Sequence, residues 1–117
     1  MIPNTRRENF LRQPVPIRLG SLAADLARVA SFGEIGDDAA IESLLEESTA
    51  FIEWCAPDLV DERVDHAARL VDIQLEIASW QRLWQKASPE FGQGKLISQA
   101  RAWSDEILAM SGLLDQE

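Results

Sequence analysis

Apolar residues recur at intervals of three and four along most of the chain, the spacing that places side chains on one face of an α-helix. No stretch alternates apolar and polar residues as a half-buried strand does. The pattern therefore predicts an all-α protein, an antiparallel four-helix bundle with short connections. The expected helices cover residues 21–33, 38–55, 59–87 and 95–111.

The expected third helix is the longest of the four, and its apolar residues cover more than half of its circumference. At 1.5 Å per residue, a helix over 59–87 measures roughly 43 Å. A helix that is apolar over more than half of its circumference is typical of a central element, contacted from several sides. We therefore expect one unbroken rod in the middle of the bundle. Its first apolar stripe comprises Val60, Val64, Ala67, Ala68, Val71, Leu75 and Ala78, and its second comprises Leu70, Ile73, Ile77 and Trp84.

The first twenty residues contain three prolines and precede the helical pattern. Proline fixes φ and restricts the residue before it, so Gln13–Pro16 should be extended. Apolar residues nearby are too frequent for a solvated tail. We expect residues 1–20 to form an extended arm packed along a single helical domain over 21–117.

The balance of basic and acidic residues also changes after residue 20. Residues 1–20 carry four arginines and one glutamate, whereas the remainder carries seven basic and nineteen acidic side chains. An acidic body repels phosphate backbones, which disfavours nucleic-acid binding, and no expected helix has the basic face that suits a membrane surface. Arg6, Arg7 and Arg12 of the arm are candidates to contact an acidic protein surface, in this chain or in a partner.

With 117 residues and 46% hydrophobic side chains, the chain suits one globular domain. Its single cysteine, Cys55, excludes an intrachain disulfide and sits at a helix C-terminus, where a thiol is not activated. No apolar run is long enough to span a bilayer, and the first residues lack the apolar core of a secretory signal. We expect a cytoplasmic protein.

Three tryptophans are candidates for protein contacts, because tryptophan is enriched at interface hot spots. Trp80 points toward the polar side of the expected third helix, Trp84 follows one turn later, and Trp103 lies at the same level on the fourth helix. We expect a homodimer that uses the Trp80/Trp84 end of the long helix. An intramolecular aromatic cluster is the alternative.

Polar residues along the third helix suggest a second kind of site. Gln74 and Gln81 are seven residues apart on one seam, and Arg63 lies on the same side. Together with His66 they are candidates to line a small-ligand pocket, although a polar layer in the core or a wet groove between helices would also explain them. One histidine and one cysteine are too few for a zinc or di-iron site.

The segment Glu62-Arg63-Val64-Asp65 resembles the ExxD half of the metal site in all-helical nucleotide pyrophosphohydrolases of the MazG type. That family pairs ExxE with ExxD on neighbouring helices, because Mg²⁺ needs converging carboxylate oxygens. The resemblance implies Mg²⁺ bound at Glu62 and Asp65. It departs in the other half, where Glu42 and Glu46 are spaced ExxxE and face away from the apolar stripe of their helix.

These observations favour a non-catalytic interaction or regulatory module that acts as a homodimer and carries no cofactor. No nucleotide-binding or nucleophile motif is found in the sequence. The alternatives are a Mg²⁺-dependent pyrophosphohydrolase of the MazG type and a small-ligand-binding bundle.

Overall fold

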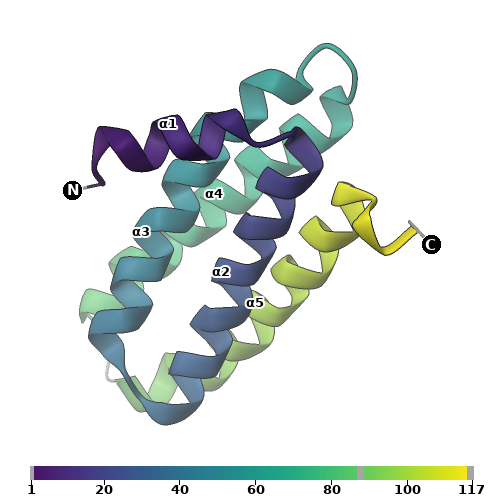
Figure 1. The fold of residues 1–117 in the computed structure, drawn as a ribbon. Coiled ribbons are helices and arrows are strands. Elements are labelled where there is room, and N and C mark those ends of the chain that lie inside the picture. Colours follow the sequence, from purple (N-terminus) through teal and green to yellow (C-terminus); the bar gives the residue numbers. More distant parts are fainter. Residues whose placement is uncertain (1, 87–88, 116–117) are drawn as a thin grey trace.

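The computed structural model describes the backbone of residues 2–86 and 89–115, and the side chains of residues 2–83 and 94–114. The described chain is helical and contains no strand, as the periodicity predicts (Figure 1). In chain order the elements are α1 (Asn4–Arg12), α2 (Val15–Ile35), α3 (Asp38–Cys55), the 3₁₀ turn η1 (Ala56–Leu59), α4 (Val64–Lys86), α5 (Pro89–Ser111) and the 3₁₀ turn η2 (Leu113–Asp115).

The expectation of an extended arm is wrong for most of residues 1–20. Asn4–Arg12 forms α1, and α2 begins at Val15, six residues before the expected start. Proline is compatible with the start of a helix, because the first backbone N–H groups of a helix have no acceptor within it. Pro3 and Pro14 stand immediately before α1 and α2. Within the predicted extended segment 13–16, Gln13 and Pro14 keep an extended backbone, with ψ of 147° and 154°, whereas Val15 and Pro16 belong to α2.

Helix α2 is the central element of the fold, packed most extensively against α5 and next against α3. Its buried apolar residues run along most of its length, from Leu19 through Leu26 to Val29. The predicted helix end at Gly33 is wrong, because α2 continues to Ile35. Gly36, whose φ of 75° suits glycine, caps the C-terminus of the helix. A Cβ on Gly33 would lie 2.7 Å from Cγ1 of Ile97, so this glycine allows α2 and α5 to approach closely.

The predicted second helix is confirmed as α3. The side chain of Asp37 accepts a hydrogen bond from the Ala40 backbone N–H at 3.1 Å and caps the helix at its N-terminus. Pro57 then falls in η1, where Val60 donates its N–H to the Pro57 carbonyl in a tighter turn.

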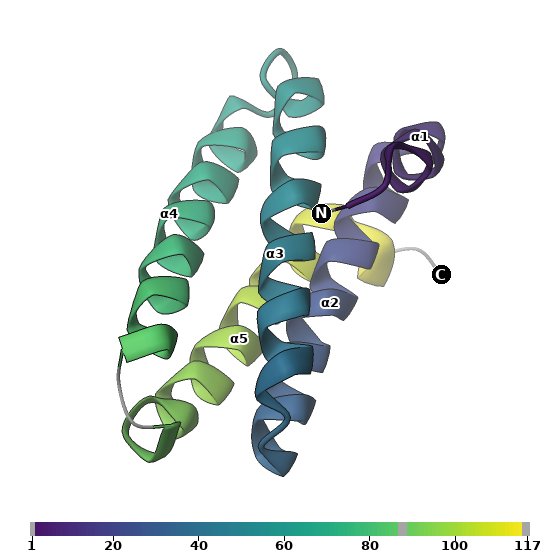
Figure 2. The same cartoon turned by 90° about the vertical axis from the view of Figure 1, so that its left-hand side faces the viewer.

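The predicted unbroken rod over 59–87 is wrong at its N-terminal end. The chain turns over residues 60–63, and α4 begins only at Val64. Three successive charged residues, Asp61 to Arg63, are all exposed in this turn, so continuing the helix would bury nothing there. The predicted central position is wrong as well: α4 lies at the edge of the assembly, beside α3 and α5 (Figure 2).

Helix α5 begins at Pro89 rather than Lys95. Proline is favoured in a first helical turn, and Gly92 and Gly94, which lie in the gap between the expected helices 59–87 and 95–111, belong to the helix. The predicted end at Ser111 is confirmed.

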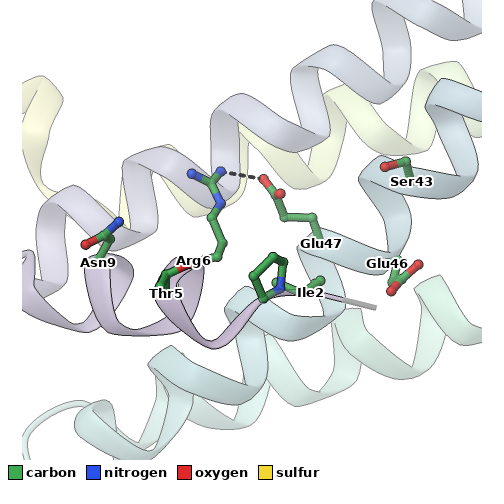
Figure 3. Close-up of a pocket in the computed structure, with 8 residues that line it drawn as sticks. Ile2, Thr5, Arg6, Asn9, Ser43, Glu46 and Glu47 are labelled. Atoms are coloured by element: carbon green, nitrogen blue, oxygen red, sulfur yellow. Dashed lines mark hydrogen bonds and ion pairs between the residues drawn. The ribbon is translucent and has the colours of Figure 1, made fainter.

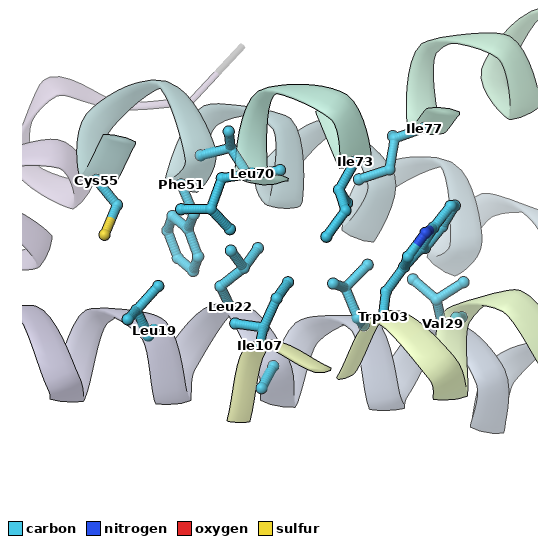
Figure 4. Close-up of a cluster of buried hydrophobic side chains, with 14 of the residues drawn as sticks. Leu19, Leu22, Val29, Phe51, Cys55, Leu70, Ile73, Ile77, Trp103 and Ile107 are labelled. Atoms are coloured by element: carbon cyan, nitrogen blue, oxygen red, sulfur yellow. The ribbon is translucent and has the colours of Figure 1, made fainter. Parts of the chain in front are cut away.

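The hydrophobic core lies between α2 and α5 on one side and α3 and α4 on the other (Figure 4). Trp103 of α5 is its largest fully buried side chain, and the indole N–H donates to Oε2 of Glu76 on α4 at 2.7 Å. Among the described residues, no helix combines the length and apolarity that crossing a bilayer requires.

Candidate interaction surface

The two apolar stripes of α4 have opposite environments. Leu70, Ile73 and Ile77 are fully buried in the core. In the other stripe Ala67 is buried and Ala78 is half-buried, whereas the remaining residues are exposed, with Val64 at 65% and Leu75 at 63% of their full accessible area. We call these exposed residues the outer α4 face: Val60 in the preceding turn with Val64, Ala68, Val71 and Leu75 of α4.

A shallow apolar groove of about 540 Å³ adjoins the outer α4 face. One wall comes from the end of α3 and from η1, and the other from α4 itself. Its lining is almost entirely apolar, and Glu53 and Gln74 are its polar members. The full lining is Ile52, Glu53, Ala56, Pro57, Val60, Val64, Ala67, Ala68, Val71 and Gln74. A shallow apolar groove of this kind is suited to the apolar face of another helix.

The four residues predicted to line a ligand pocket do not form one pocket. Nε2 of Gln74 lies 3.3 Å from a Glu53 carboxylate oxygen and 3.5 Å from the Thr49 carbonyl oxygen, across one edge of the groove. Arg63 and His66 instead contact each other at the start of α4, with 2.7 Å between Nη2 and Nε2. The groove lining includes Gln74 but not Arg63, His66 or Gln81.

The predicted tryptophan anchors have different surroundings. Trp103 is fully buried, so it is not available to a partner of the folded chain. Trp80 is half-buried and packs against the core, on the side of α4 away from the outer face. The side chain of Trp84 lies outside the described residues. The exposed apolar surface therefore lies nearer the N-terminus of α4 than the tryptophan pattern indicates.

Helix α1 is held against α3 by one aromatic and one basic side chain. Phe10 stacks on Phe51 with ring centroids 4.2 Å apart. Nη2 of Arg6 donates to Oε1 of Glu47 at 2.8 Å, beside an open hollow of about 420 Å³ between α1 and α3 (Figure 3). Arg7 and Arg12 are exposed on α1, so the predicted basic surface is present but is carried by a helix.

Arg18, predicted as part of the arm, is a buried structural residue. Its guanidinium donates to the carbonyls of Gln13 at 2.7 Å and Leu11 at 3.2 Å, and it pairs with Asp58 in η1. These bonds satisfy carbonyls that the end of α1 leaves without helical partners. Arg18 therefore fixes the corner between α1 and α2.

A carboxyl pair that the sequence pattern did not indicate joins α2 to α3, between buried Asp25 and half-buried Glu47. Asp25 is 1% exposed, and its Oδ1 accepts from Nη1 of Arg28 at 3.1 Å. Burial raises the pKa of Asp25 to about 8, with help from its hydrogen bond to Glu47. The pKa of Glu47 is lowered: burial opposes this shift, but hydrogen bonds from Asp25 and Arg6 favour the charged form. Asp25 follows Leu22 by three residues and therefore lies on the same face of the helix. An acidic residue on this apolar face is the sequence signal that indicates a buried carboxyl group.

The residues expected to bind Mg²⁺ in the MazG resemblance do not converge. Asp65 is exposed in the first turn of α4, 3.6 Å from Nε of Arg63. Glu62 is exposed in the turn before it, and Glu42 and Glu46 are exposed on α3. The described residues hold no cluster of three or more histidine, cysteine or acidic side chains that could bind a metal ion. Burial raises the pKa of the Cys55 thiol to about 11, so this thiol is a core residue without a nucleophile's reactivity.

No protein-family model matches this chain. Comparison with curated proteins and with solved structures finds no match either. We therefore infer the function from the geometry of the chain itself.

Proposed function

We propose that this protein is a non-catalytic interaction module, an antiparallel bundle of α2 to α5, that forms a homodimer through the outer α4 face. The observation that carries the proposal is the row of exposed apolar side chains on this face, beside an apolar groove. Apolar residues scattered over a surface are ordinary, but a contiguous patch marks an interaction site. We place its action in the cytoplasm.

The energetics fit a concentration-dependent dimer. Full burial of a valine or leucine side chain contributes about 1.5–3 kcal/mol. Val60, Val64, Val71 and Leu75 are each about half exposed, so burying them contributes about 1 kcal/mol apiece. Two copies together gain about 8 kcal/mol, which lies within the range of about 4–15 kcal/mol that association costs. Contacts made by Ala68 and the groove then decide the affinity.

Light scattering and sedimentation over a range of protein concentrations test the proposal. We expect the mass to rise from that of one chain, 13.1 kDa, toward that of two. Leu75→Asp should keep the chain monomeric, because it places a charge within the apolar contact. Leu114→Asp is the matched control, since Leu114 is 68% exposed but lies in η2, outside the outer α4 face. A chain that stays monomeric up to several hundred micromolar would contradict the proposal.

A further inference from the structure

We infer that the two copies pair antiparallel along the outer α4 face, so that Val64 of each chain lies against the partner copy's Leu75. This inference rests on the proposed function and adds the orientation of the second copy. It also identifies a charged contact at each end of the paired helices, between Arg82 of one copy and the acidic turn of the other.

The spacing of the apolar residues suits a two-fold axis. Val64, Ala68, Val71 and Leu75 follow one another at intervals of four, three and four, so the stripe reads the same in both directions. An axis through the midpoint between Ala68 and Val71 pairs these two residues across copies, and Val64 with Leu75. Such self-complementarity is the requirement for a C2 interface. The small Ala68 near the midpoint lets the two helices approach closely.

Charge distinguishes the antiparallel orientation from the parallel one. The turn before α4 and the first turn of the helix carry three exposed acidic residues, Asp61, Glu62 and Asp65, against the one exposed arginine Arg63, which lies 3.6 Å from Asp65. Near the other end, exposed Arg82 follows Leu75 by seven residues, on the same face. Antiparallel pairing brings each Arg82 over the other copy's acidic turn, whereas parallel pairing brings the two acidic ends together.

Disulfide crosslinking of the full-length chain tests the orientation. Val64 and Leu75 are eleven residues apart, about 16 Å along the helix, which is too far for a bond within one chain. In the antiparallel dimer, a mixture of Val64→Cys and Leu75→Cys chains should crosslink under mild oxidation. Either variant alone should not, because its two cysteines lie about 16 Å apart. The wild-type chain controls for Cys55, which is buried.

The outcomes separate the orientation from the proposed function. Efficient crosslinking of Val64→Cys alone would show parallel pairing and overturn the inference, as would a mixture that scatters as a dimer yet does not crosslink. Chains that scatter as monomers would overturn the proposed function as well.

The charged contact has its own measurement. Arg82→Glu should weaken dimerisation about two- to thirtyfold, because the symmetric dimer loses two exposed ion pairs. Arg7→Glu is the control, because Arg7 is an exposed arginine on α1, away from α4, and should leave the dissociation constant unchanged. Equal effects of the two substitutions would assign the change to net charge and overturn the contact.

Discussion

Replacing Asp25 with asparagine should make the stability of this protein less dependent on pH. Asp25 is buried between α2 and α3, and its hydrogen bond to Glu47 requires a proton on one of the two carboxyls. Asparagine has nearly the same shape, stays neutral and can donate an N–H to Glu47. The substitution therefore keeps the packing and the hydrogen bond while it removes the titration of Asp25.

The sign of the effect follows from where the proton is held. In the unfolded chain an aspartate titrates near pH 4, whereas burial raises the pKa of Asp25 in the folded chain to about 8. Between these values the folded protein holds a proton that the unfolded chain releases, so its stability falls as the pH rises. Each pH unit in this window costs about 1.4 kcal/mol. Even if folding raises the pKa of Asp25 by only half as much, the free energy of unfolding falls by about 3 kcal/mol across this pH window.

Urea unfolding followed by tryptophan fluorescence at pH 4, 6 and 8, at one protein concentration, measures the effect. Asp25→Asn should come closest to the wild-type chain at pH 4, where Asp25 is protonated in the folded chain and about half protonated in the unfolded chain. At pH 8 it should exceed the wild-type free energy of unfolding by about 3 kcal/mol or more. Asp105→Asn, the same change at an exposed position of α5, is the control. A difference between wild type and Asp25→Asn that stays constant with pH would refute the reasoning.

Three further substitutions test the packing. Gly33→Ala should destabilise the fold by about 1–3 kcal/mol in urea unfolding, because the added methyl group meets Ile97. Trp103→Phe should cost about 2–3 kcal/mol in the same assay, since it opens a gap in the core and removes the hydrogen bond to Glu76. Arg18→Gln should speed hydrogen exchange throughout α1 and cost about 2–3 kcal/mol, whereas exposed Arg12→Gln should change neither by much.

The sequence predicts α3 well because both of its boundaries are set locally. Asp37 caps the first turn through its own side chain, and Pro57 falls just beyond the end. Neither signal depends on how the rest of the chain packs. The same holds for the end of α5 at Ser111, which Gly112, with a φ of 75°, follows.

Proline misleads in the first twenty residues because one φ value suits two structures. A φ near −65° fits both the extended backbone and the first turn of a helix, and the residues that follow decide between them. Both structures occur here, since Pro14 is extended immediately before α2 and Pro16 lies in the first turn of that helix. Arg18 was equally ambiguous: charge alone assigned it to a basic arm, whereas its burial depends on the carbonyls of α1 that lie nearby only after folding.

The environment of α4 depends on tertiary packing, which periodicity does not report. Both apolar stripes were visible in the sequence, but nothing local says which stripe meets the core. The close packing of α2 against α5 decides which stripe meets the core. Ser104 of α5 donates to the Ala23 carbonyl at 2.8 Å, and Gly33 leaves room for Ile97. With α2 in the centre, α4 buries one stripe against the core and keeps the other exposed.

The outer α4 face therefore contributes only part of its apolar surface to the folding of a single chain. Leu70, Ile73 and Ile77 already bury α4 against the core, and polar residues on the opposite face would serve a monomer equally well or better. Valines at 64 and 71 even lower helix propensity slightly relative to the charged residues common on exposed faces. A sequence that leaves about half of the surface of these apolar side chains exposed in the monomer favours a second surface that covers them. We propose another copy of the same chain as that surface, because the spacing of the stripe is symmetric.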